Sequence, residues 1–189
     1  GTTKMKKFLV IGNPIEHSLS PKLHNYWIKS NNLKVIKTNR GGKTTYHGPG
    51  QRIIYLMINL ERFSYDIRKY VSFLEQLIMD TLYEFNIITH RWDKAIGVWT
   101  YKQINSRKIV NKERHKIASI GIRVRKKISF HGISVNINPN LDFFDKIFPC
   151  GLENSKATSA KELGVKVSYN DFDEALKLNF EKLLRNYTK

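Results

Sequence analysis

The segment from Arg40 to Gln51, RGGKTTYHGPGQ, constrains the fold more than any other stretch of the chain. It holds four glycines and one proline in twelve residues, a composition unsuited to an ordinary helix or a flat central strand. Glycine reaches positive φ without strain and lets the backbone approach a ligand closely. Polar side chains fill the gaps, and the apolar run 53–58 follows. This order predicts a binding loop that leads into a buried strand.

This loop admits two other interpretations. Gly42, Lys43 and Thr44 resemble the end of a phosphate-binding loop, but that motif also requires a glycine five residues before the Gly-Lys pair. Position 37 is a lysine, so the sequence does not predict a phosphate loop. A tight surface turn without a ligand is the remaining alternative.

Length and composition predict one domain with a substantial core. The chain has 189 residues and 41% hydrophobic residues, and it contains no apolar run near the roughly 20 residues that cross a bilayer. The first residues lack the pattern of a signal peptide. We therefore expect a cytoplasmic protein that does not bind a membrane.

Net charge and cysteine content limit which partners and which kinds of site the chain can have. The net charge of +17 favours acidic partners, whether nucleic acid or protein. Cys150 is the single cysteine, so a disulfide within the chain is excluded and a cysteine-based zinc site is disfavoured. The six histidines show no HExxH spacing. We expect no metal.

Periodicity predicts an α/β (α+β) fold. Apolar residues recur at helical spacing between Ser64 and Glu84, with Ser64 or Asp66 as the cap. Further helices are expected over 141–147, from Thr158 to Leu163 with a capping box, and over about 171–187. Strands are expected over 6–12, 52–59 and 96–101, and the runs 116–123 and 128–137 are expected to form an antiparallel pair.

Four motifs together resemble the lipoyl(octanoyl) transferase family. RGGKTTYHGPGQ matches its signature, and Lys116-Ile-Ala-Ser-Ile-Gly121, His131-Gly132 and Pro149-Cys150-Gly151 follow in the family's order. The resemblance covers about residues 35–189. It implies a mainly antiparallel sheet with packed helices, as in the biotin/lipoate ligase and transferase superfamily.

The resemblance implies an acyltransferase of lipoate biosynthesis. An octanoyl group would pass from octanoyl-acyl carrier protein, through a cysteine thioester, to a lysine of a lipoyl-domain protein. The implied acceptors are the lipoyl domains of 2-oxoacid dehydrogenases and the glycine cleavage H protein. The resemblance implies no cofactor and no nucleic acid, and we expect a monomer.

The resemblance also assigns site residues. Cys150 would be the nucleophile, and Lys116 would favour its thiolate and transfer protons, because a free thiol has a pKa near ~8.5. Without the family order, a lone cysteine is more often a small buried apolar residue. We expect His47 and His131 to be hydrogen-bonded structural residues. The implied substrate-binding residues are Arg40, Gly41, Gly42, Lys43, Thr44, Thr45, Tyr46, His47, Gly48, Ser119, Ile120, Gly121, His131, Gly132, Ile133 and Ser134.

Residues 5–30 resemble a different family. His17-Ser-Leu-Ser-Pro-Lys-Leu-His-Asn25 after a strand is similar to the N-terminus of shikimate dehydrogenase, where Ser18 and Ser20 would hold the substrate. No GxGxxG motif follows a strand later in the chain. We therefore expect residues 1–32 to be a shikimate-dehydrogenase-like fragment. It would be joined to an octanoyl transferase domain, 33–189, that lacks the family's usual N-terminal part.

The sequence leaves three alternatives open. The chain is a working octanoyl transferase, a catalytically impaired chimera of that family, or a basic nucleic-acid-binding module. A lipoate–protein ligase is a further alternative, although it would need ATP, whereas a cysteine suits transfer from a thioester.

Overall fold

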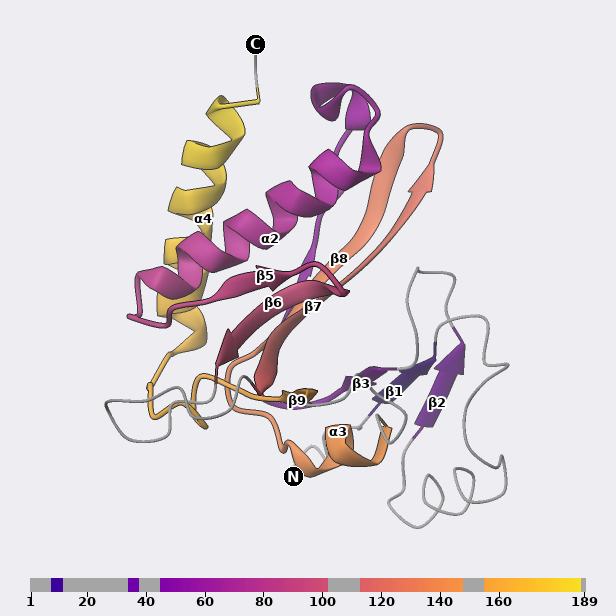
Figure 1. Cartoon of the computed structure of the whole chain (residues 1–189). Coiled ribbons are helices and arrows are strands. Elements are labelled where there is room, and N and C mark those ends of the chain that lie inside the picture. The colour runs from indigo at the N-terminus through magenta and orange to yellow at the C-terminus, as the bar shows by residue number, and fades with distance from the viewer. Residues whose placement is uncertain (1–7, 12–33, 38–44, 102–112, 148–154, 188–189) are drawn as a thin grey trace, which may run out of the picture.

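Two β-sheets and four helices make up the described part of the chain. The computed structural model describes residues 8–11, 34–37, 45–101, 113–147 and 155–187 (Figure 1). In the smaller sheet, β1 (Phe8–Ile11) pairs in parallel with β2 (Lys34–Lys37) and antiparallel with β3 (Thr45–His47). The predicted strand over 6–12 is therefore confirmed in its central residues.

The larger sheet is mainly antiparallel, as predicted. Its strand order is β4-β8-β7-β6-β5, and β9 pairs in parallel with β7. The strands are β4 (Gln51–Tyr55), β5 (His90–Trp92), β6 (Ala95–Tyr101), β7 (Arg114–Arg125), β8 (Ile128–Asn136) and β9 (Ser155–Ala157). The long β7–β8 hairpin confirms the antiparallel pair expected from the sequence.

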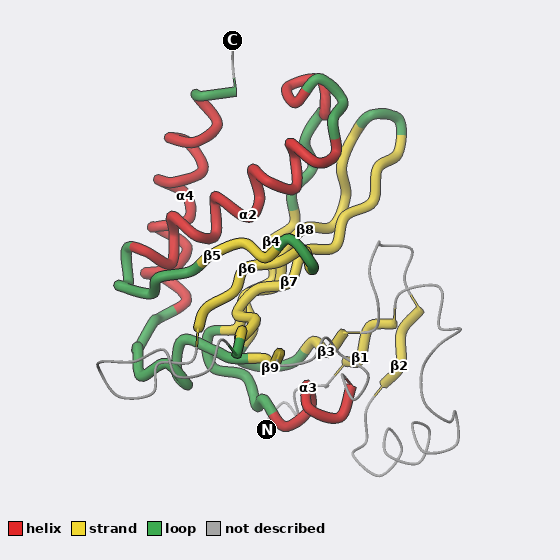
Figure 2. The backbone as a smooth tube through the Cα atoms, viewed as in Figure 1, coloured by secondary structure: helices red, strands yellow, loops and turns green. Residues whose placement is uncertain are grey.

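Two long helices lie on the same side of this sheet (Figures 1 and 2). They are α2 (Ile67–Tyr83) and α4 (Tyr169–Arg185), and two short helices, η1 (Leu60–Phe63) and α3 (Asp142–Ile147), complete the set. Asp66 caps α2 by accepting hydrogen bonds from the backbone N–H groups of Arg68 and Lys69. No helix within the described ranges is both long and apolar enough to cross a bilayer.

The hydrophobic core fills the space between the sheet and the two long helices. Fully buried apolar side chains of this core include Leu74, Ile78, Phe172, Val98 and Ile117. Burial of each such side chain stabilises the fold by about 1.5–3 kcal/mol. The opposite surface of the sheet, called the second face below, carries different residues. There β4 presents Ile53 and Tyr55, which are 37% and 72% exposed.

The expected helix from Thr158 to Leu163 is wrong. The chain makes a turn there, although the Ser159 hydroxyl accepts a hydrogen bond from the Glu162 N–H at 3.1 Å, as a capping box would. Gly164 follows with φ of 78°, so the chain leaves helical geometry after a single turn. The expected strand over 52–59 stops early, at Tyr55. Beyond it, Leu56 and Ile58 keep single backbone hydrogen bonds to β8, and Asn59 forms an isolated bridge with Ile128.

Replacement of Gly132 by alanine is expected to destabilise the sheet. A Cβ atom at Gly132 would lie 2.2 Å from the backbone carbonyl oxygen of Ile54 on β4. Backbone cannot move aside as a flexible side chain can, so we expect the free energy of unfolding to fall by about 2–3 kcal/mol. Urea denaturation of the native chain and the variant measures this difference.

Gly164→Ala is the matched control. Gly164 has positive φ, but apart from its chain neighbours no described atom lies within 4 Å of the place that a Cβ would take. Its replacement is therefore expected to cost only the backbone strain, about 1 kcal/mol. Equal losses in the two variants would contradict the steric argument for Gly132.

Candidate functional site

A β-bulge in β7 determines where Lys116 lies. Val98 of β6 pairs with Ala118, whereas the next residue, Trp99, pairs with Lys116, so Ile117 is an extra residue on β7. Ile117 and Ala118 are both buried in the core. Because two successive residues of a bulge take the same side, Lys116 lies on the second face, away from α2 and α4.

The Lys116 side chain is held against its neighbours on β6. Its Nζ lies 5.2 Å from the ring centroid of Trp99, a cation–π distance. Its Cε packs over Gly97, because a Cβ added to Gly97 would lie only 2.4 Å from this Cε. Gly97 has φ of 140° and donates its N–H to Glu75 Oε1 of α2 at 3.2 Å. The half-buried Lys116 therefore lies over a glycine and beside an aromatic ring.

Four predicted substrate-binding residues lie on the same face as Lys116. Ser119 of β7 pairs with Ser134 of β8, and Gly121 pairs with Gly132. The Ser134 hydroxyl is buried and has no hydrogen-bond partner within the described part of the chain. Gly121 and Gly132 lie directly opposite each other and place no side chain on the second face at this point.

Ile120 and Ile133 lie on the other face of the sheet from these four residues. The side chain of Ile133 is 3% exposed and belongs to the core, and that of Ile120 packs against the core. Their side chains therefore face the helices, and only their backbone borders the second face. His131, also predicted as a substrate-binding residue, has a left-handed backbone with φ of 65°.

Aromatic contacts join the glycine-rich segment to the helix that precedes Cys150. Tyr46 is 1% exposed and stacks on Phe143 of α3 at 4.8 Å, with Phe144 edge-on at 5.6 Å. Burial raises the pKa of Tyr46. An added Cβ at Gly48 would lie 1.9 Å from the Tyr46 hydroxyl oxygen, so glycine is required there while this ring keeps its position.

A chain of hydrogen bonds connects the glycine-rich segment to the backbone of Lys116. The Gly48 N–H donates to Gln51 Oε1 at 3.1 Å, and Gln51 Nε2 donates to Asn136 Oδ1 at 2.9 Å. Asn136 Nδ2 then donates to the carbonyl of Thr158 at 3.0 Å, and the Thr158 N–H donates to the carbonyl of Lys116 at 2.9 Å. The chain fixes three separate sequence motifs relative to one another.

Gln51, Asn136 and Thr158 were not predicted as site residues from the sequence. Two signals were available. Gln51 closes the glycine-rich segment, and Asn136 is a polar residue at the end of the apolar strand 133–137. His47 lies beside this chain, with its Nδ1 3.2 Å from Gln51 Oε1. His47 is thus hydrogen-bonded as expected, and its structural role stays a prediction.

Some predicted site residues lie outside the described residues, namely Cys150 and the loop residues Arg40 to Thr44. Ser18 and Ser20 of the N-terminal motif also lie outside. The described chain resumes at Ser155, and Ala157 of β9, seven residues after Cys150, pairs directly with Lys116. Within the described ranges, no group of three or more His, Cys, Asp or Glu residues is arranged to hold a metal ion.

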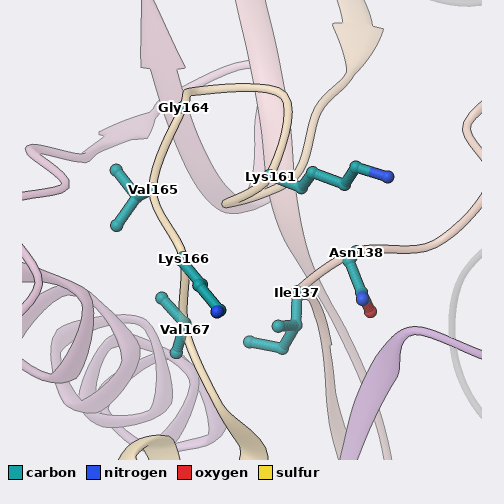
Figure 3. Close-up of a pocket in the computed structure, with 7 residues that line it drawn as sticks. All are labelled: Ile137, Asn138, Lys161, Gly164, Val165, Lys166 and Val167. Carbon is teal, nitrogen blue, oxygen red and sulfur yellow. The ribbon is translucent and has the colours of Figure 1, made fainter.

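The structure also contains a cavity of about 320 Å³ (Figure 3). Its walls come from the end of β8 and the turn before α4, including Ile137, Lys161 and Val165. None of the predicted site residues lines it. The second face around Lys116 is thus the better candidate site, because its cation and small residues suit an anionic reacting centre.

Known proteins resemble this chain over most of its length. A family model described as the lipoyl protein ligase A/B catalytic domain matches residues 5–181. An octanoyltransferase of Bartonella tribocorum is 50% identical over 151 residues, which cover 79% of this chain and 61% of that protein. The chain thus spans less than two thirds of the length of that relative.

Solved structures share the fold at low sequence identity. A bipartite lipoate protein ligase from Thermoplasma acidophilum, studied with its E2 lipoyl domain, gives a TM-score of 0.70 at 14% identity and covers 95% of this chain and 68% of that chain. The biotin protein ligase of Aquifex aeolicus, in complex with biotin and ATP, gives a TM-score of 0.58 at 15% identity and covers 96% and 69%. With the family model matching most of its length, this chain belongs to the lipoyl protein ligase A/B catalytic domain family.

Proposed function

We propose that this chain transfers an octanoyl group from octanoyl-acyl carrier protein, through a thioester on Cys150, to a lysine of a lipoyl-domain protein. One observation carries the proposal. The bulge at Ile117 sets Lys116 on the same face as Ser119, Gly121, Gly132 and Ser134. A cation, buried hydroxyl and small residues together suit a reaction in which negative charge develops on sulfur and oxygen.

The first step is acylation of the cysteine. The Cys150 thiolate, favoured by the Lys116 ammonium, attacks the thioester carbonyl carbon of the donor. The tetrahedral intermediate collapses as the bond between that carbon and the donor sulfur breaks. Lys116 gives its proton to the departing thiolate. The products are the octanoyl-enzyme, the free thiol of the donor and a neutral Lys116.

The second step transfers the acyl group to the acceptor. The neutral ε-amine of the acceptor lysine attacks the octanoyl thioester on Cys150, and Lys116 takes the proton that the amine loses. The carbon–sulfur bond breaks and the Cys150 thiolate is restored. Because an amide is more stable than a thioester, the transfer needs no ATP. Backbone N–H groups of Ser119–Gly121 or of the segment 40–44 are the proposed donors to the oxyanion.

The proposed acceptors are lipoyl domains of 2-oxoacid dehydrogenases and the glycine cleavage H protein, with the reaction in the cytoplasm. Support comes from the octanoyltransferase relatives and from the lipoate ligase that was studied with its E2 lipoyl domain. A strongly basic chain, with 33 Lys and Arg against 16 Asp and Glu, suits an acidic carrier protein as donor.

Intact-protein mass spectrometry tests the proposal. The native chain is mixed with octanoyl-acyl carrier protein, and one added octanoyl group on the enzyme is the expected result. Addition of a lipoyl domain is expected to remove that group and to leave the domain octanoylated on lysine. A folded protein that gains no octanoyl group would contradict the proposed activity and would favour the catalytically impaired chimera.

A further inference from the structure

A cluster of aromatic and cationic side chains continues from Lys116 across β6 to Trp92 of β5. Strand β5 lies at the edge of the larger sheet (Figure 1). Tyr101 of β6 pairs with Arg114, just as Trp99 pairs with Lys116, so Arg114 lies two residues from Lys116 on the same face. The Arg114 guanidinium lies 4.7 Å from the ring centroid of Trp92 and 5.6 Å from that of Tyr101. Arg114, Trp92 and Tyr101 are called the arginine–aromatic site below.

Arg114 differs from the other arginines that the structure holds in place. Arg52 forms an ion pair with Asp173, and Arg91 donates to Glu75 Oε2 at 3.0 Å. In the described part of the chain, by contrast, no carboxylate or carbonyl accepts a hydrogen bond from Arg114, and its Nε is buried without a partner. An arginine held by rings alone has donors that no acceptor among the described residues uses, and an anionic ligand would satisfy them.

The acid nearest to Arg114 in sequence is engaged elsewhere. Glu113 lies 3.4 Å from His115 Nε2 and 3.6 Å from Lys156 Nζ. On the other side, His90 stacks on Tyr101 at 4.2 Å. Burial, and then the charge of Arg114, lower the pKa of His90. Among the described residues, therefore, no carboxylate of the arginine–aromatic site balances the positive charge of Arg114.

We propose that the arginine–aromatic site binds a carboxylate of the acceptor protein that lies within about two residues of the lysine to be acylated. The proposal rests on the function proposed above. Two residues along a strand span about 6.6 Å, so a group bound at Arg114 lies close to the reacting centre at Lys116. A side chain next to the target lysine meets this spacing.

The phosphate of a phosphopantetheine arm is the other anion that the reaction would bring. It is separated from the reacting sulfur by the whole length of the arm, which does not fit the short spacing between Arg114 and Lys116. Arg114 would then act on the second half-reaction and on the choice of acceptor, while formation of the octanoyl-enzyme would not depend on it. The guanidinium, already oriented by two rings, suits the planar fork of a carboxylate.

Single-turnover discharge of the octanoyl-enzyme tests this inference. For Arg114→Gln, we expect the kcat/KM for discharge by a lipoyl domain to fall about 10- to 100-fold, the loss typical of a charge-assisted hydrogen bond. Discharge by hydroxylamine, which carries no carboxylate, is expected to remain unchanged. Arg114→Lys is expected to recover part of the rate, because it keeps the charge but loses the fork.

Two comparisons separate binding from a merely structural role. Arg123→Gln removes an exposed arginine from the same strand, nine residues away, and is expected to leave discharge by the lipoyl domain unchanged. A lipoyl domain whose acids next to the target lysine are replaced by amides is expected to react equally with the native chain and Arg114→Gln. If the effects of the two changes, one in each protein, do not add in this way, the two side chains are in direct contact.

Direct binding decides the inference independently of catalysis. The dissociation constant of the unmodified lipoyl domain is expected to rise about 10- to 100-fold for Arg114→Gln. An unchanged dissociation constant for Arg114→Gln would overturn the inference. So would an equal fall in the rate of discharge by hydroxylamine, or a fall in rate confined to acylation by the carrier donor. If the native chain formed no octanoyl-enzyme, the proposed function would fail while this binding measurement still decided the role of Arg114.

Discussion

Lys116→Met is expected to slow formation of the octanoyl-enzyme by about 10²–10⁴-fold, the range typical of a positioned general acid or base. Methionine keeps an unbranched side chain that can lie over Gly97 and against Trp99, as the lysine does. It lacks the charge that would favour a thiolate and the proton that the departing thiol requires. The variant should therefore fold normally and lose reactivity.

Rapid-quench mixing with the octanoyl donor, followed by intact-mass measurement, gives the rate of this step. Lys161→Met is the matched control, because Lys161 is an exposed lysine in the turn before α4. It is expected to react like the native chain. An unchanged rate for Lys116→Met would remove Lys116 from the mechanism.

Cys150→Ser is expected to abolish the octanoyl-enzyme within the lifetime of the assay, with turnover at least about 10³-fold slower. A serine hydroxyl ionises far less readily than a thiol, so an ammonium group cannot provide a comparable fraction of the anion at neutral pH. Cys150 is the only thiol in the chain. The variant therefore tests the covalent route directly.

Intact mass after exposure to the donor, and octanoylation of a lipoyl domain, are the two readouts. The unfolding curve in urea should match that of the native chain, which excludes a folding defect. If Cys150→Ser still octanoylated the lipoyl domain at the native rate, the acceptor lysine would attack the donor thioester directly and the two-step route would be wrong.

The sequence predicted the long, regular strands and helices best. The β7–β8 hairpin and α2 have long and consistent apolar periodicity, which is the strongest signal available without a structure. Strands β3, β5 and β9 have three residues each, too few for a pattern to repeat, and they were not predicted. The turn after Thr158 was mistaken for a helix because its capping residues are those of a helix start.

The orientation of Lys116 was not available from the sequence. Strict alternation along β7 would place it on the same side as Ala118, inside the core. The bulge at Ile117 reverses this, and only the pairing with β6 shows it. Arg114, Trp92 and Tyr101 were missed for the same reason, since no local pattern relates three residues on three strands.

The assignment of residues 1–32 to a shikimate-dehydrogenase-like fragment stays a prediction. Within this stretch the structure describes only β1, which pairs with β2 and β3. The family model begins its match at residue 5.

The extra residue in β7 makes chain length, rather than residue identity, decisive for the candidate site. Insertion of one residue between Lys116 and Ile117 would shift Lys116 to the position of His115, opposite Thr100 and on the helix side of the sheet, where an unpaired charge is strongly disfavoured. Substitution of Ile117 by valine would leave the count of residues unchanged. An insertion at this point should therefore be far less tolerated in this chain than the exchange of one apolar residue for another.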